Sequence, residues 1–169
     1  MATQGTGVAL LVSKLWWGHA GRLSTCGSRA QARDFNFIGD LKLRVINCYI
    51  PSGRERRNDE EITKWIKYEY NSAREERRGV ILLGDFNAVR DPRIARKPIG
   101  QQRGSRPETE LLEWIETQPL QDAFRAMHPL SRDYTCQETS RIDMIFLSGL
   151  LDDKIIKVRH KKLETVKSD

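Results

Sequence analysis

Two polar side chains follow a short apolar run near the middle of the chain. The run from Val80 to Leu83 is rich in branched residues, glycine brackets it at Gly79 and Gly84, and Asp85 and Asn87 come next. Such runs are typical of strands buried on both faces. A carboxylate and a carboxamide at the end of a buried strand stand where sheet enzymes place their chemistry. Asp and Asn also form ordinary polar turns, and on this stretch alone the turn is the simpler interpretation.

A tyrosine closes a second predicted strand. The segment 41–50 predicts a strong strand that begins at an exposed end, where Lys42 and Arg44 alternate with apolar residues, and then enters a core. Pro51 follows and cannot continue a ladder of hydrogen bonds. Tyr49 at this end is either a positioner of phosphate or water, or a core tyrosine with a satisfied hydroxyl.

An aspartate lies inside a third predicted strand, over 141–148. Asp143 alternates in phase with Ile145 and Leu147, so we expect it to point into the core. A buried carboxylate without a partner is costly. Arg141 is one candidate partner, and a histidine or a metal ion from elsewhere in the chain is the sharper one.

The segment 90–106 is a long basic loop with no acid after Asp91. It either lies along a phosphate backbone or is a solvated surface loop, and the two interpretations carry equal weight. The net charge of +6 and a pI near 9.4 suit a polyanionic partner only weakly. The candidate nucleic-acid-binding residues are Arg93, Arg96, Lys97, Arg103 and Arg106.

Helical periodicity predicts the elements that must position these residues. Segment 58–77 is the clearest helix, with Asn58 and Glu61 in a capping-box pattern and apolar residues at helical spacing. A second helix begins at Ser105 and carries apolar residues over 111–115. Further strands are expected at 7–13, 22–26, 32–38 and 155–159, with a turn at Gly39-Asp40. Segments 14–21 and 120–134 are expected to be irregular.

Composition indicates a single domain over residues 1–169 and no membrane-spanning segment. Three cysteines without ligand-like spacing fit free thiols in a reducing, intracellular compartment, the nucleus among the options. The adjacent Trp16 and Trp17 either stack on bases or cover an apolar edge, and we favour the second. His19 has no partner at ligand spacing.

Four motifs in order resemble the endonuclease/exonuclease/phosphatase superfamily, over nearly the whole chain from Gly7. They are Asn47-Cys48-Tyr49-Ile50-Pro51, Gly84-Asp85-Phe86-Asn87, Ser140-Arg141-Ile142-Asp143 and the terminal Ser168-Asp169. The segment 120–125, with His128-Pro129 and Tyr134-Thr135, is similar to the endonucleases of non-LTR retrotransposons in particular. Two parts of the family pattern are not found: an N-terminal part with an asparagine and a metal-binding glutamate, and the histidine of a final Ser-Asp-His. Ser52 stands where relatives of the abasic-site type carry asparagine.

The resemblance implies an α/β fold, in which two packed β-sheets flanked by helices form a four-layer sandwich, here with the first strands missing. It implies hydrolysis of phosphodiesters, by nicking of DNA, with Mg²⁺ or Mn²⁺ as cofactor. In this family's pattern Asp85 orients or deprotonates the water, while Tyr49 and Asn87 donate hydrogen bonds to the phosphate. Asp143 orients the absent histidine, and Asp169 helps to hold the metal.

Because the glutamate and the histidine are absent, we expect this chain to be a weak or inactive nuclease. His19, His128 and His160 do not stand in the Ser-Asp-His position. Two alternatives remain open. One is a non-catalytic, nucleic-acid-binding remnant, and the other is a phosphatase of the same fold that acts on lipid or nucleotide phosphates.

Overall fold

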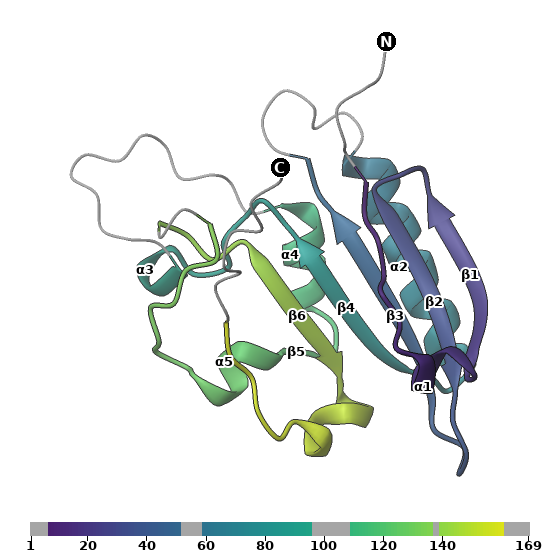
Figure 1. Cartoon of the computed structure of the whole chain (residues 1–169). Helices are drawn as coiled ribbons and strands as arrows, with labels where there is room; N and C mark the ends of the chain where they lie inside the picture. The colour runs from purple at the N-terminus through teal and green to yellow at the C-terminus, as the bar shows by residue number, and fades with distance from the viewer. Residues whose placement is uncertain (1–6, 52–58, 96–108, 137–138, 161–169) are drawn as a thin grey trace, which may run out of the picture.

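Six strands form one mixed sheet in the order β1-β2-β3-β4-β6-β5. The computed structural model describes residues 7–51, 59–95, 109–136 and 139–160. The strands are β1 (Ala20–Cys26), β2 (Ala30–Asn36), β3 (Lys42–Tyr49), β4 (Gly79–Asp85), β5 (Leu120–Asp122) and β6 (Asp143–Ser148) (Figure 1). β3 and β4 pair in parallel, whereas every other neighbouring pair is antiparallel.

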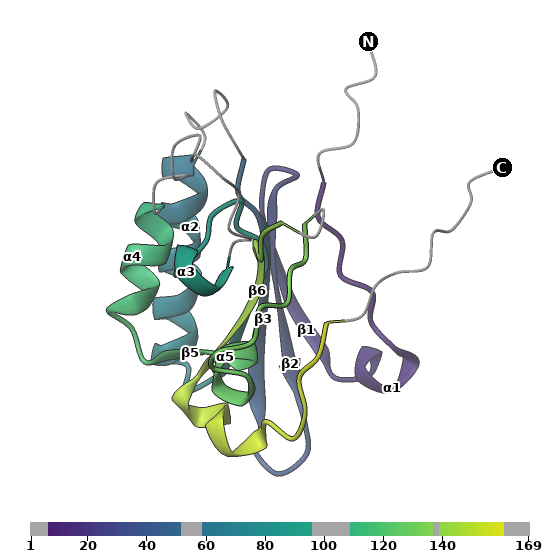
Figure 2. The same ribbon diagram turned by 90° about the vertical axis from the view of Figure 1, so that its left-hand side faces the viewer.

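The parallel pair at the centre of the sheet requires a crossover, and α2 (Asp59–Glu75) supplies it. α2 and α4 (Glu110–Glu116) cover one face of the sheet (Figure 2). The remaining helices are α1 (Lys14–Trp17), α3 (Pro92–Ala95), α5 (Ala123–Met127) and a 3₁₀ helix at Gly149–Lys154. None of the helices in the described ranges is both long and apolar enough to cross a bilayer.

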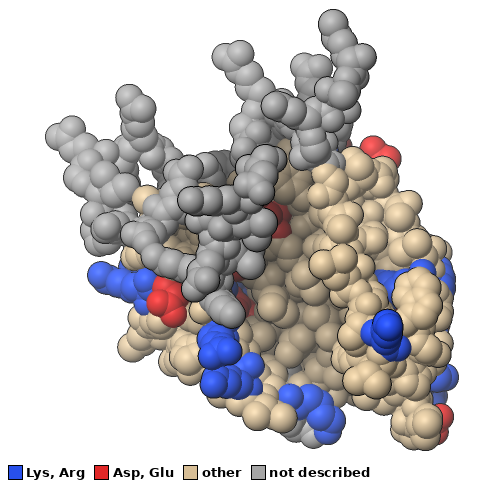
Figure 3. All heavy atoms as spheres, in the orientation of Figure 1, with Lys and Arg blue, Asp and Glu red and all other residues tan. Residues whose placement is uncertain are grey.

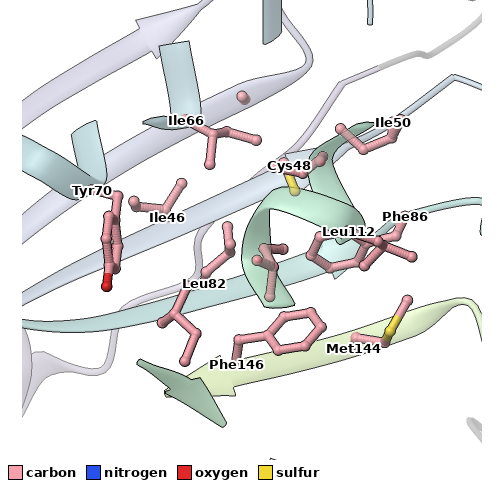
Figure 4. Packing of buried hydrophobic residues seen from close by; sticks show 14 of the residues in the cluster. Ile46, Cys48, Ile50, Ile66, Tyr70, Leu82, Phe86, Leu112, Met144 and Phe146 are labelled. Carbon is pink, nitrogen blue, oxygen red and sulfur yellow. The ribbon is translucent and has the colours of Figure 1, made fainter. Parts of the chain in front are cut away.

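The main core lies between the sheet and the helices α2 and α4. Ile46, Leu82 and Phe146 come from three adjacent strands and pack against Ile66 of α2 and Leu112 of α4 (Figure 4). All five side chains are buried. Each fully buried aliphatic or aromatic side chain of this kind contributes about 1.5–3 kcal/mol, so this layer holds the three central strands together.

The other face of the sheet is covered only in part. Leu10 and Val12, from the extended segment 7–13, pack on it beside Ile81 and Leu83, while Ile145 of β6 is 43% exposed. Figure 3 looks onto this face, which is mostly uncharged and hollowed at its centre, with Lys and Arg side chains along the lower left margin. We call it the open face.

A fully buried arginine corrects one expectation for β3. Arg44 was expected at an exposed end of the strand, but its side chain is enclosed beneath α2. It donates to both carboxylate oxygens of Asp34 at 2.6 and 3.0 Å, to the Glu69 carbonyl and Ser72 Oγ, and to Glu76 Oε1 at 2.9 Å. Burial of this charge is tolerated because acidic partners surround it.

The strongest predicted elements are confirmed. β3, β4, β6 and α2 lie where the sequence predicted them, and so do the first two strands. The turn at Gly39-Asp40 has left-handed backbone at both residues, with φ of 81° and 62°. Trp16 makes edge-to-face contacts with Phe35 and Phe37, at centroid distances of 5.3 and 4.9 Å. It therefore covers an apolar edge, as favoured.

Other predictions are wrong. Segments 7–13 and 155–159 are extended but do not form strands, because they run over the open face without joining the ladder. The segments expected to be irregular contain α1, β5 and α5, and the basic loop begins with α3. Thr109 caps α4, accepting from the Leu112 amide at 3.3 Å. Asn58 and Ser105, the predicted helix starts, lie outside the described residues. A second sheet is not seen within the described ranges.

Candidate functional site

Gly84 brings the ends of β3 and β4 into close contact. It pairs with Cys48 in the parallel register, and its φ of 147° lies in a region that side chains rarely adopt. A Cβ at this position would lie 1.8 Å from the Cys48 carbonyl oxygen. The glycine is therefore required where the sheet reaches the candidate site.

Three of the predicted site residues lie in one row across the sheet. Tyr49 pairs with Asp85 between β3 and β4, and Asp85 pairs with Asp143 between β4 and β6. Adjacent strands are about 4.8 Å apart, so these positions are immediate neighbours. The burial patterns of the strands put all three on the open face, opposite the helices. The structure thus brings together residues that are 94 positions apart in the chain, from 49 to 143.

Asn87 is separated from this row by a turn. Its backbone N–H donates to Asp85 Oδ1 at 2.8 Å, its φ is 47°, and its Nδ2 donates to the Ile50 carbonyl at 2.9 Å. The carboxamide thus holds the ends of β3 and β4 together. The simple turn interpretation accounts for these contacts of Asn87, and its predicted bond to a phosphate stays a prediction.

The predicted burial of Asp143 is wrong. Asp143 is exposed, because Met144 and Phe146 form the core face of β6 and place Asp143 on the open face. Arg141, its candidate partner, instead forms a buried ion pair with Asp122. The Asp143 backbone N–H donates to Thr135 Oγ1 at 3.1 Å, which fixes the start of the strand. Asp143 needs no buried partner, since its carboxylate is not in the core.

Tyr49, Asp85 and Asp143 line one cavity of about 480 Å³ on the open face. His160 lines it too, and no pattern in the sequence indicated this. The ring of His160 stacks on Phe124 at a centroid distance of 4.1 Å, and its Nδ1 is buried without a partner among the described residues. Burial, and then the Arg141 charge, lowers the pKa of His160, so the ring is neutral near pH 7.

Cys48 lies beneath the same cavity and is not a nucleophile. Its thiol is fully buried, and burial, with a smaller contribution from the Asp85 charge, raises its pKa strongly. Only the thiolate attacks or binds a metal. The other polar side chains that line this cavity are those of Asn47, Tyr49, Asp85, Arg141, Asp143, Arg159 and His160.

The described residues do not make up a complete metal site. Asp85 and Asp143 offer carboxylate oxygens of the kind that Mg²⁺ and Mn²⁺ prefer. No group of three or more His, Cys, Asp or Glu side chains able to hold an ion is found within the described ranges. Asp169, the predicted ligand, lies outside them.

Only one residue of the predicted basic surface can be placed. Arg93 of α3 is strongly exposed and pairs with Asp91, Nη2 to Oδ2, at 2.9 Å. Arg96, Lys97, Arg103 and Arg106 lie outside the described residues. The expectation that this loop follows a phosphate backbone stays a prediction.

No protein-family model matches the chain, and no curated protein matches it. Solved structures do. The catalytic domain of APE2 from Xenopus laevis has a TM-score of 0.58, at 20% identity over 75% of this chain and 48% of that one. The 3'-5' exonuclease NExo from Neisseria meningitidis has a TM-score of 0.53, at 21% identity over 75% of this chain and 54% of that one.

A 3' phosphatase NExo from Neisseria, bound to a product DNA hairpin, has a TM-score of 0.52 at 21% identity, over 75% of this chain and 54% of that one. The chain thus spans about half the length of the solved structures it matches. At these identities the likeness establishes the fold alone, and the chain corresponds to part of the fold of those solved structures.

Proposed function

We propose that this chain carries part of the active site of a metal-dependent phosphodiesterase that nicks DNA, of the kind found in retroelements. The observation that carries the proposal is the row of Tyr49, Asp85 and Asp143 along one cavity of the sheet. It stands on a fold shared with solved nucleases and phosphatases. The retroelement branch rests on the motifs in the sequence.

In the proposed reaction a water molecule attacks phosphorus, and the bond between phosphorus and the leaving oxygen breaks. Asp85 orients the water and accepts its proton. The Tyr49 hydroxyl donates a hydrogen bond to a phosphate oxygen, where negative charge accumulates. The divalent ion that the resemblance implies would supply further neutralisation of charge. The described residues do not complete its site, so no step here depends on it.

The cavity supplies a second group for proton transfer. A neutral His160 can accept or donate a proton, and it lines the same cavity as Asp143. In the resemblance Asp143 orients a histidine that follows Ser168-Asp169. We propose that His160 acts in place of that histidine in the present chain. We expect it to be a poor substitute, so that hydrolysis is slow.

The open face supports the finer expectation of two packed sheets. Ile81, Leu83 and Ile145 present apolar side chains there, and the segment 7–13 covers only part of them. Sheets that pack face to face bury side chains of this type. We propose that strands from outside this sequence complete the sandwich.

A non-catalytic remnant that binds nucleic acid is the second candidate. It is favoured by the absence of three converging metal-ligating side chains among the described residues, and by the structural bonds of Asn87. Such a remnant would bind DNA with the steep salt dependence of a phosphate-backbone binder. Neutralising Arg93 and two further cations of the loop is expected to reduce the log–log slope by about 0.9 per lost contact.

A plasmid-nicking assay in Mg²⁺, in Mn²⁺ and in EDTA tests the proposal. It compares this chain with a chain extended at both ends by its own reading frame. We expect weak or no nicking by the present chain and metal-dependent nicking by the extended one, because groups that act as a unit lose most of their effect when one is removed. Absence of nicking by both, with salt-dependent DNA binding retained, would favour the remnant.

A further inference from the structure

A second cavity, of about 520 Å³, lies beside the row of site residues. Its charged lining consists of Arg90, Arg93, Arg125 and Arg141, with the carboxylates of Asp91 and Glu116. Both carboxylates are engaged: Asp91 with Arg93 at 2.9 Å, and Glu116 with Arg90 Nε at 2.8 Å. The other two arginines, Arg125 and Arg141, form no ion pair with Asp91 or Glu116 in the described structure.

Arg141 is a buried cation with an unused donor. Its side chain is 1% exposed, and its Nη groups both bond the Asp122 carboxylate. Its Nε has no hydrogen-bond partner among the described residues. A buried N–H group of a charged side chain that lacks a partner is costly. A ligand with a hydrogen-bond acceptor near Arg141 Nε would remove this cost.

Arg125 is a second cation with an unused donor, and its side chain is half-buried. Its Nη1 donates to two backbone carbonyls, of His128 at 3.3 Å and of Ser131 at 2.7 Å. Its Nη2 is buried and also unpaired within the described ranges. Burial, and then the neighbouring Arg141 charge, lowers the pKa of Arg125.

Within the described residues Arg141 has one carboxylate as its ion-pair partner and Arg125 has none. Asp122 is the nearest buried carboxylate, and it also accepts from the backbone N–H groups of Phe124 and Arg125 at 3.1 Å each. Asp122 forms its ion pair with the buried Arg141, whereas the half-buried Arg125 is influenced by the charges of Asp122, Asp91 and Asp133 without an ion pair to any of them among the described residues. Charges buried in this way are stable when further counter-charge is supplied.

We propose that Arg125 and Arg141 form an anion site that takes a phosphate group. The unpaired Nε–H of Arg141 and the unpaired Nη2 group of Arg125 would each donate a charge-assisted hydrogen bond to a phosphate oxygen. The lining holds four arginines against the carboxylates of Asp91 and Glu116, and this excess of positive charge would attract an anion to the cavity. Arg141 lines both cavities, so the proposed anion site adjoins the cavity of Tyr49, Asp85 and Asp143. The inference goes beyond the proposed function, because it requires no hydrolysis.

Arginine side-chain NMR tests this directly. The Nε–H resonances are followed while inorganic phosphate replaces chloride at constant ionic strength. We expect saturable shifts for Arg125 and Arg141. Arg44 is the internal control, because Asp34, Glu69, Ser72 and Glu76 occupy its donors. Unmoved Arg125 and Arg141 resonances, or small linear shifts shared with Arg44, would overturn the proposal.

A second probe identifies the source of the phosphate. A thymidine dinucleotide with one phosphodiester and no terminal phosphate is titrated in the same way. Saturable shifts with either probe support the site: tighter binding of the dinucleotide indicates a nucleic-acid backbone, and tighter binding of inorganic phosphate indicates a free phosphate. Failure of both probes contradicts the site, whatever the nicking assay shows.

Two variants at the rim separate binding from folding. Arg90→Gln is expected to weaken phosphate binding about fivefold, whereas Glu116→Gln is expected to strengthen it by a similar factor. The two residues form one exposed ion pair, so a purely structural effect of breaking it would change both affinities in the same direction. Arg74→Gln on α2 is the matched control, and we expect no change. Parallel losses in both rim variants would contradict the proposal.

Discussion

Among the residues that the structure describes, two arginines, Arg44 and Arg141, are buried, and their surroundings differ. Arg44 makes five hydrogen bonds, which use all the N–H groups of its guanidinium. Arg141 bonds one carboxylate through its Nη groups, has no partner for its Nε within the described ranges, and lines two cavities. All the N–H groups of Arg44 are bonded to protein atoms, and these bonds hold α2 against the sheet. Arg141 retains capacity for a ligand, so burial alone does not distinguish a structural arginine from a binding one.

The largest expected effect comes from Arg44→Leu. Removal of this cation leaves the buried carboxylates of Asp34 and Glu69 with only the partly exposed Arg78 and Arg22 as counter-charges. We expect the free energy of unfolding to fall by about 3–5 kcal/mol. Urea titration measures it, and a loss under a third of that value would show that Arg22 and Arg78 take over the pairing.

Arg141→Leu is expected to be milder. Asp122 would keep two backbone N–H donors that cap α5, so its charge stays partly compensated. The loss of stability should be about 1–3 kcal/mol, together with loss of the phosphate response of Arg125. If Arg44→Leu and Arg141→Leu lowered the free energy of unfolding equally, the proposed difference between the two arginines would be contradicted.

The acid stability of the Arg44 cluster sharpens the comparison. Hydrogen bonds from Arg78, and then from Arg44 and Ser72, lower the pKa of Glu76 from 4.5 to about 2. A depressed folded pKa stabilises the fold fully above 4.5, and this contribution is lost as pH falls from 4.5 toward 2. Glu76→Gln should remove that part of the pH dependence. Since Glu76 is 41% exposed, we expect less than about 1 kcal/mol.

This pH dependence is measured from the urea midpoints of unfolding across the same pH range. The matched control is Glu60→Gln, whose partner Lys64 is exposed. A Glu76→Gln variant with the same pH dependence as the parent chain would contradict the assignment.

The smallest expected effect is a gain in stability, from Asp143→Asn. Asp143 stands opposite Asp85 in the antiparallel register, and like charges in that position repel. Asp143→Asn should therefore raise the free energy of unfolding by roughly 0.2–1 kcal/mol, since its side chain is exposed. Asp133→Asn serves as a surface control. Destabilisation by Asp143→Asn would mean that its carboxylate makes a structural bond.

Much of the sheet and of the site row could be predicted from the sequence. Apolar runs with glycine and proline boundaries mark β3 and β4, and the polar residues at their ends fall in register because parallel strands end together. The phase of β6 could not be predicted. Ile145 and Leu147 are as apolar as Met144 and Phe146, so alternation alone does not show which side faces the helices.

Features that depend on tertiary contacts had no signal in the sequence. His160 reaches the cavity because its segment returns over the sheet, where His128 bonds the Val158 carbonyl at 2.8 Å. The burial of Arg44 depends on acids from β2 and α2. By contrast, α5 did carry a local signal: Asp122 caps it, and an N-cap aspartate before an apolar turn favours a helix.

The most direct test of the central claim is Asp85→Asn in the extended chain, assayed by plasmid nicking. Asparagine keeps an oxygen that can accept the Asn87 N–H, so the turn persists and only the charge and basicity are lost. We expect nicking to fall by about 100-fold or more, while Asp40→Asn, a turn residue with left-handed backbone that asparagine tolerates, has no effect. Nicking by Asp85→Asn at the parent rate would contradict the assignment of this cavity as the site of hydrolysis.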